Sequence, residues 1–235
     1  MALLGSKINT FISKDTMRRI ISDIREIRQN PLTQHGIYYE HDETDMLKGK
    51  ALIIGPADTP YADGFYLFKF KFPVNYPHLP PEVEFCTHDG ETRFNPNLYR
   101  SGKVCLSILN TWQGEQWSGC QTISSVLLAI CTVLNESPLL NEPGLTKAHR
   151  DFENYNKIIT YKNIKVAIFD TLSSIIIKDN FACFVEIMRE YFQNNKENIR
   201  RRLAGKEKAG KEMTATGVYS MNICINYAEL LEKFD

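Results

Sequence analysis

Residues 94–107 read FNPNLYRSGKVCLS, and they bring two chemically distinctive side chains close together in the sequence. Asn97 precedes Cys105 across the turn-forming pair Ser101-Gly102, which can fold the chain back on itself. A thiolate carries an acyl group as a thioester that stays reactive toward amines, and a nearby amide can stabilise the oxyanion. The pair therefore predicts acyl transfer through Cys105, with its sulfur reachable from water. The structural alternatives are that Cys105 is a small buried apolar residue and that Asn97 only orders the loop backbone.

Motifs on both sides of this stretch resemble the active-site region of ubiquitin-conjugating enzymes. In chain order they are Asn95-Pro96-Asn97, Gly102-Lys103-Val104-Cys105-Leu106, Trp117-Ser118 and the helix-like segment 122–134. The family usually has His-Pro-Asn where this chain has Asn95. Within this family, the chain resembles the Z type in particular. The likeness is carried by the segments 93–97, 107–112, 141–144 and 164–167. The resemblance covers roughly residues 14–172.

The resemblance implies an α+β structure, the ubiquitin-conjugating (UBC) fold, with a four-stranded antiparallel meander flanked by helices. We expect a core domain at residues 14–160 and, from apolar stripes at helical spacing, a helical C-terminal extension at residues 161–235. Cys105 would accept ubiquitin or a ubiquitin-like modifier as a thioester from an activating enzyme and pass it to a substrate lysine. The implied partners are therefore the modifier, the ubiquitin-activating enzyme, a ubiquitin ligase and a protein substrate. The reaction needs no metal or organic cofactor.

Three further residues take roles from their position in the resemblance. Glu142 matches an acidic residue with which the family often orients or deprotonates the incoming lysine; the alternative is an ordinary exposed carboxylate. Arg18 and Arg19 lie on the basic face of the first predicted helix, with which the family docks the activating enzyme. The alternative for this face is a solvated surface.

Two loops correspond to the ligase contacts of the family. The first contains His78 between prolines, which also predict a rigid corner of the chain. The second contains Gly119 and Cys120. The family usually has an aromatic residue at the place of His78 and Ser-Pro-Ala at residues 118–120, so this chain departs from the pattern that serves the commonest ligase types.

Composition restricts the class of protein. Lys plus Arg equals Asp plus Glu at 28 each, so no overall field favours a nucleic acid or a membrane as partner. The six cysteines form no Cys-x-x-Cys pair, which argues against a zinc site or a disulfide framework and indicates a reducing compartment. The first seven residues are too briefly apolar for a signal peptide, and no long apolar run follows. We therefore expect a soluble protein of the cytoplasm, with the nucleus as a second compartment.

Apolar periodicity predicts the elements independently of the resemblance. A first helix has its stripe at residues 17–27, behind a cap at Ser13, and a second helix at 123–134 would lie across a sheet. Strands are predicted at 37–40, 49–54, 65–72 and 82–85. Apolar stripes at helical spacing follow at 164–175 and 181–192. The charged segment 196–212 is predicted to be a mobile linker, and residues 223–234 are predicted to form a last helix. Trp112 and Trp117 are predicted to pack against the core.

Two other classes of protein compete with a conjugating enzyme. A catalytically inactive ubiquitin-binding variant of the same fold needs neither Cys105 nor Asn97, so the presence of both counts against it. A cysteine protease needs a histidine paired with Cys105, and none of the five histidines has a recognisable spacing to it.

Overall fold

A computed structural model describes residues 11–234 of the chain. Helix α1 spans Lys14–Gln29 and begins where predicted, because the Ser13 side chain caps it by accepting a hydrogen bond from the Thr16 backbone N–H at 3.0 Å. Ile20 and Ile27 on its apolar face are buried in the core. The predicted amphipathic first helix is therefore confirmed.

Four strands form one antiparallel meander in the order β1-β2-β3-β4. They are β1 Ile37–His41, β2 Lys48–Ile54, β3 Phe65–Lys71 and β4 Glu82–Phe85. In the register, Ala51 on the second strand faces Tyr39 on one side and Phe68 on the other. The four predicted strands and their meander are confirmed.

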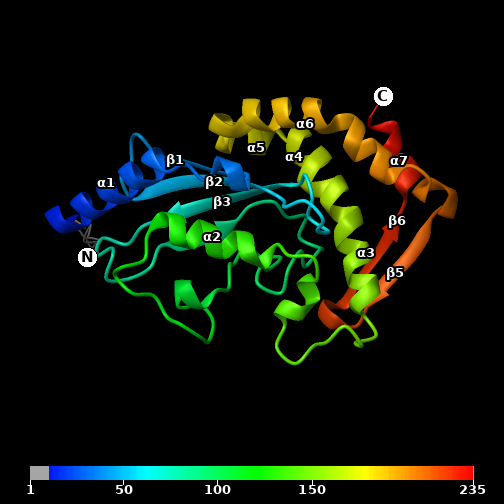
Figure 1. The fold of residues 1–235 in the computed structure, drawn as a ribbon, viewed down its shortest axis with the longest axis horizontal. Helices are drawn as coiled ribbons and strands as arrows, with labels where there is room; N and C mark the ends of the chain where they lie inside the picture. The colour runs from blue at the N-terminus through cyan, green and yellow to red at the C-terminus, as the bar shows by residue number, and fades with distance from the viewer. Residues whose placement is uncertain (1–10, 235) are drawn as a thin grey trace, which may run out of the picture.

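The sheet lies between two helical layers (Figure 1). Helix α2, Ile123–Val133, covers one face, and helix α6, Ala182–Leu203, covers the other. Tyr191 on α6 meets Phe65 on β3 edge to face, with ring centroids 6.1 Å apart. Side chains on both faces of β3 are buried for this reason, among them Tyr66 and Leu67.

A continuous helical stretch carries the chain from the core into its C-terminal part. Helix α3, Phe152–Lys162, passes without a break into the π-helical segment Asn163–Asp170 and α4, Thr171–Ser173; α5, Ile175–Asn180, follows. Asn163 fastens this stretch to the core. Its Oδ1 accepts a hydrogen bond from the Tyr66 hydroxyl at 2.6 Å, and its Nδ2 donates to the Ala62 carbonyl at 2.9 Å. The domain boundary between 14–160 and 161–235 falls within this stretch and stays a prediction.

The predicted mobile linker at 196–212 is wrong. Helix α6 continues to Leu203, and both Ile199 and Leu203 are buried. A short 3-10 turn, Lys206–Ala209, then leads into a strand. Ile199 and Leu203 are four positions apart, so they lie on the same face of the helix and pack its last turns against the core among charged neighbours.

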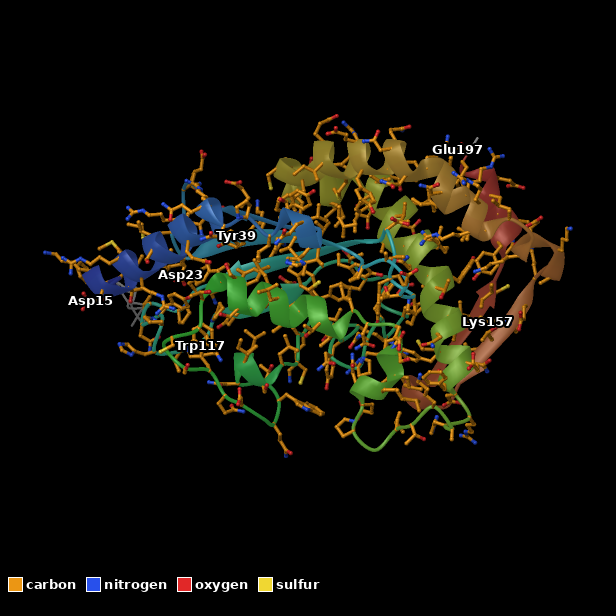
Figure 2. All side chains as sticks on the ribbon, in the orientation of Figure 1. Asp15, Asp23, Tyr39, Trp117, Lys157 and Glu197 are labelled. Atoms are coloured by element: carbon orange, nitrogen blue, oxygen red, sulfur yellow. The ribbon has the colours of Figure 1, made fainter. Side chains whose placement is uncertain are left out.

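A β-hairpin replaces the first part of the predicted last helix. Its strands are β5, Glu212–Thr216, and β6, Met221–Ile225, and only Tyr227–Glu232 forms a helix, α7. Burial alternates along β6, as a period of two requires, so Ile223 belongs to a strand. The hairpin runs along α3, where Lys157 pairs with Glu212 at 2.5 Å (Figure 2).

Candidate active site

The hairpin that carries Cys105 turns at Gly102, whose φ of +86° suits glycine. Leu98 and Val104 face each other across it as an antiparallel bridge. Next to them, the Cys105 N–H donates to the Asn97 carbonyl at 2.8 Å, and Asn97 Nδ2 donates to the Cys105 carbonyl at 2.7 Å. The chain therefore folds back as predicted, but the amide of Asn97 meets the backbone of Cys105 instead of its thiol.

The thiol of Cys105 lies beneath the turn that follows it. Cys105 is 2% exposed, and its Sγ donates a hydrogen bond to the Thr111 carbonyl at 2.8 Å. The Thr111 hydroxyl holds this turn to the chain by accepting from the Leu106 N–H at 2.9 Å. The prediction that water can reach the Cys105 sulfur is wrong for this conformation. The turn covers the thiol and provides it with a hydrogen-bond acceptor.

Asn95 connects the segments around this hairpin. It is fully buried, and its Nδ2 donates to the Tyr61 hydroxyl at 2.7 Å. Its Oδ1 accepts from the Asn97 N–H at 2.9 Å and from Asn141 Nδ2 at 3.3 Å. A chain of hydrogen bonds thus links Asn141, through Asn95 and Asn97, to the carbonyl of Cys105.

Glu142 follows the 3-10 turn Pro138–Asn141 and is half-buried. Its carboxylate accepts a hydrogen bond from the Tyr219 hydroxyl. Burial, and after it the carboxylate of Glu142, raises the pKa of Tyr219 well above its usual value, so the phenol remains a neutral donor at physiological pH. Glu142 is therefore a carboxylate paired with Tyr219, next in the sequence to Asn141, where the hydrogen-bond chain to Cys105 begins.

The two arginines of α1 have different surroundings. The Arg19 guanidinium pairs with Asp23 at 2.8 Å and donates to the carbonyls of Gly119 and Gln121, so this side chain is bound within the chain. Arg18 is exposed. The free basic surface of the helix is therefore smaller than the sequence predicts.

The two loops that correspond to ligase contacts lie next to each other. Trp117, labelled in Figure 2, joins them by donating from Nε1 to the Pro77 carbonyl at 2.7 Å. His78, Gly119 and Cys120 are all exposed. The structure thus gathers these three candidates at the end of the molecule where Arg19 contacts the second loop.

The two tryptophans differ in their packing. Trp117 packs on Tyr76, with ring centroids 5.8 Å apart, as predicted. Trp112 is 40% exposed, so its predicted core packing is wrong. Residues 110–116 are all exposed and provide no apolar layer for this ring.

Three of the other cysteines have raised pKa values, so a smaller fraction of each is thiolate at neutral pH. Burial raises the pKa of Cys86 to about 11, and it also raises the pKa of Cys131 and Cys183.

Within residues 11–234, no three His, Cys, Asp or Glu side chains are arranged to hold a metal ion. None of the helices in that same range is long and apolar enough to cross a membrane.

Sequence reasoning missed three residues of this site: Thr111, Asn141 and Tyr219. Thr111 lies within the motif 107–112 of the resemblance, but it meets the thiol through a backbone carbonyl, which every residue type has, so nothing in the sequence marks this contact. Tyr219 contacts Glu142 from 77 positions away in the chain. Asn141 lies within one of the motifs of the resemblance, which is the only signal that could have found it.

A four-stranded antiparallel meander flanked by helices is the arrangement that the sequence resemblance implies. Residues 19–167 match the family model described as "Ubiquitin-conjugating enzyme". This match spans more than half of the chain, so the chain belongs to the ubiquitin-conjugating enzyme family.

Three curated relatives illustrate the similarity. "Ubiquitin-conjugating enzyme E2 Z" of Danio rerio is 46% identical over 167 residues, which cover 70% of this chain and 50% of the relative. The protein of the same name from Homo sapiens is 48% identical over 157 residues, 66% of this chain and 44% of the relative. "Probable ubiquitin-conjugating enzyme E2 R521" of Acanthamoeba polyphaga mimivirus is 32% identical over 209 residues, 83% of this chain and 14% of the relative. The chain thus spans about half the length of the E2 Z relatives or less.

Proposed function

We propose that this protein accepts ubiquitin, or a ubiquitin-like modifier, as a thioester on Cys105 and transfers it to a substrate lysine. The observation that carries the proposal is the pair of hydrogen bonds between Asn97 and Cys105, at 2.8 and 2.7 Å. They fix the backbone on which the nucleophile sits, and fixed geometry is the main contribution that a protein makes to acyl exchange. Membership of the family supports the same chemistry.

The reaction has two transfers. In the first, the Cys105 thiol loses its proton and attacks the thioester carbonyl on the activating enzyme, whose own thiolate leaves and takes up a proton. In the second, the substrate ammonium gives its proton to Glu142 or to water, and the free amine attacks the new thioester. The oxyanion then collapses, Cys105 leaves as the thiolate and takes up the proton that the attacking nitrogen loses, and an amide remains. The turn at Thr111 has to release the thiol before the first step, because it covers the sulfur.

The partners follow from this chemistry: the modifier, an activating enzyme, a ligase and a lysine-bearing substrate. We assign contact with the activating enzyme to the face of α1 that carries Arg18, which is exposed. Ligase contact is assigned to His78, Gly119 and Cys120, because these exposed residues lie on adjacent loops. Arg19 supports the proposed ligase surface, because its hydrogen bond to the Gly119 carbonyl holds that loop to α1.

A loading assay tests the proposal. The protein is mixed with an activating enzyme, ATP and ubiquitin, and the products are separated with and without a reducing thiol. We expect an adduct that the thiol removes, that is absent in Cys105→Ala, and that becomes resistant to the thiol in Cys105→Ser because an oxygen ester replaces the thioester. Cys224→Ser is the control, since Cys224 is an exposed cysteine on β6 and belongs to none of the assigned partner surfaces. No adduct with any activating enzyme and modifier would exclude the proposal.

The burial of Cys105 favours one second candidate, a ubiquitin-binding protein of the same fold without transfer activity. In that case ubiquitin would bind reversibly, and Cys105→Ala would leave the dissociation constant unchanged while no adduct forms in the wild-type protein. Titration followed by NMR, beside the loading assay, separates the two candidates.

A further inference from the structure

The turn of the C-terminal hairpin lies beside the segment that joins α2 to α3, as Figure 1 shows. This turn, Val218–Ser220, contains two consecutive residues with left-handed backbone, Tyr219 at φ +61° and Ser220 at φ +48°. Residues with a Cβ rarely adopt this conformation, and they keep it only where surrounding contacts hold them. The contacts of Tyr219 should therefore show what holds this turn in place.

Tyr219 contacts both parts of the candidate active site. Its hydroxyl donates a hydrogen bond to the carboxylate of Glu142. Its backbone carbonyl accepts from Arg100 Nη2 at 2.5 Å, and Arg100 lies in the hairpin between Asn97 and Cys105. One residue of the C-terminal part thus joins the loop of the candidate lysine-orienting residue to the hairpin of the nucleophile.

The ring of Tyr219 is held independently of its hydroxyl. The Arg93 guanidinium lies 4.9 Å from the centroid of this ring and 3.2 Å from that of Tyr99. Arg93 also donates to the carbonyls of Asn95 and Pro96, at 3.1 and 2.7 Å. Replacing Tyr219 by Phe therefore removes the bond to the carboxylate and keeps the packing of the turn.

We propose that Tyr219 is a positioning residue whose hydroxyl fixes the Glu142 carboxylate in the orientation that receives the substrate lysine. The inference rests on the proposed function and deepens it, because it makes the C-terminal hairpin part of the transfer site. One carboxylate oxygen, Oε2, is held by the phenol, and Oε1 is left to meet the amine. The conformational freedom of a glutamate side chain is then lost before the substrate arrives, which lowers the barrier to the transfer.

The test follows discharge from protein loaded with ubiquitin on Cys105. Loaded Tyr219→Phe is mixed either with free lysine, which is protonated at pH 7, or with hydroxylamine, a small nucleophile that is neutral at that pH and needs no carboxylate to orient it. We expect normal loading, lysine discharge slower by roughly three- to tenfold, and unchanged hydroxylamine discharge. Equal lysine rates, or an equal loss with both nucleophiles, would overturn the inference.

Two comparisons make the test specific. Tyr219→Phe combined with Glu142→Gln should discharge no more slowly than Glu142→Gln alone, because the tyrosine acts through the carboxylate; multiplicative effects would contradict this. Tyr191→Phe is the matched control, since this hydroxyl bonds a carboxylate oxygen of Asp63 at 2.7 Å on another part of the molecule, and it should discharge normally. Failure of the wild-type protein to load would overturn both the proposed function and this inference, whereas normal loading with normal Tyr219→Phe discharge overturns the inference alone.

Discussion

The side-chain nitrogen of Asn97 lies 2.7 Å from the backbone carbonyl oxygen of Cys105, while the thiol of Cys105 donates to the carbonyl of Thr111. The amide is thus attached to the residue that bears the nucleophile, but its hydrogen bond orders the backbone. To stabilise the oxyanion as well, the amide would have to exchange this carbonyl for the developing charge during transfer. The two roles have different kinetic consequences.

The Asn97→Ala variant separates these roles. If the amide donates to the oxyanion of lysine transfer, Cys105 loads nearly normally, and discharge onto free lysine slows by about a hundred- to a thousandfold. If the amide only orders the loop, loading slows as well. Single-turnover gels measure both rates. Asn154→Ala, which removes a bond from α3 to the Ala215 carbonyl, serves as the control, and lysine discharge of Asn97→Ala at the wild-type rate would remove the oxyanion role.

The turn over Cys105 should respond to Thr111→Val. This change removes the hydroxyl that accepts from the Leu106 N–H at 2.9 Å, and the turn then opens more often. We expect alkylation of Cys105 by iodoacetamide to rise roughly fivefold, since a neutral hydrogen bond contributes about 1 kcal/mol. Mass spectrometry measures the rate, with alkylation of the exposed Cys120 in the same sample as the internal reference. Thr132→Val, whose hydroxyl bonds the Ala129 carbonyl on α2, should change nothing; an unchanged rate for Thr111→Val would contradict the covering role.

Local patterns carried most of the fold prediction. The four strands, both early helices and the fold-back before Cys105 depend on alternation, caps and turn residues that lie within a few positions of one another. The contact of Tyr219 with Glu142 depends on residues 77 positions apart, and it is made by a turn without glycine at its left-handed positions. The prediction for segment 196–212 failed because its two buried apolar residues, Ile199 and Leu203, lie among many charged and polar neighbours and so form no visible apolar stripe.

The end of α6 provides a test of packing against mobility. Leu203 is 2% exposed, so Leu203→Ala should lower the free energy of unfolding by about 2–5 kcal/mol through the cavity it leaves. Denaturation by urea, followed by circular dichroism, measures the change. Ile176→Ala is the control, because Ile176 is 71% exposed and its loss should cost within about 0.5 kcal/mol. A mobile linker would instead make Leu203→Ala as mild as the control.

The ion pair between Lys162 and Asp89 predicts a dependence of stability on pH. The two groups lie 2.7 Å apart, with the lysine side chain 7% exposed. Burial by itself would raise the pKa of Asp89, but hydrogen bonds from Lys162 and from the Thr92 N–H outweigh it and leave the pKa below its usual value. A carboxyl with a lowered folded pKa adds stability above its unfolded pKa, which is near 3.9, and this stability is lost as the pH falls through the folded pKa.

Asp89→Asn should therefore be less stable than the wild type at pH 7 by about 2–3 kcal/mol, because it leaves the Lys162 charge buried with only the more distant Glu91 at 3.5 Å. The difference should begin to shrink as the pH falls below the unfolded pKa, and it should continue to shrink as the pH falls through the lower folded pKa, where the wild-type carboxyl becomes protonated too. Urea denaturation across this pH range measures both. Glu91→Gln is the matched control, since its side chain is 74% exposed and should contribute within about 0.5 kcal/mol at any pH. A difference between Asp89→Asn and wild type that stays constant down to low pH would show that the lost stability does not come from the ion pair.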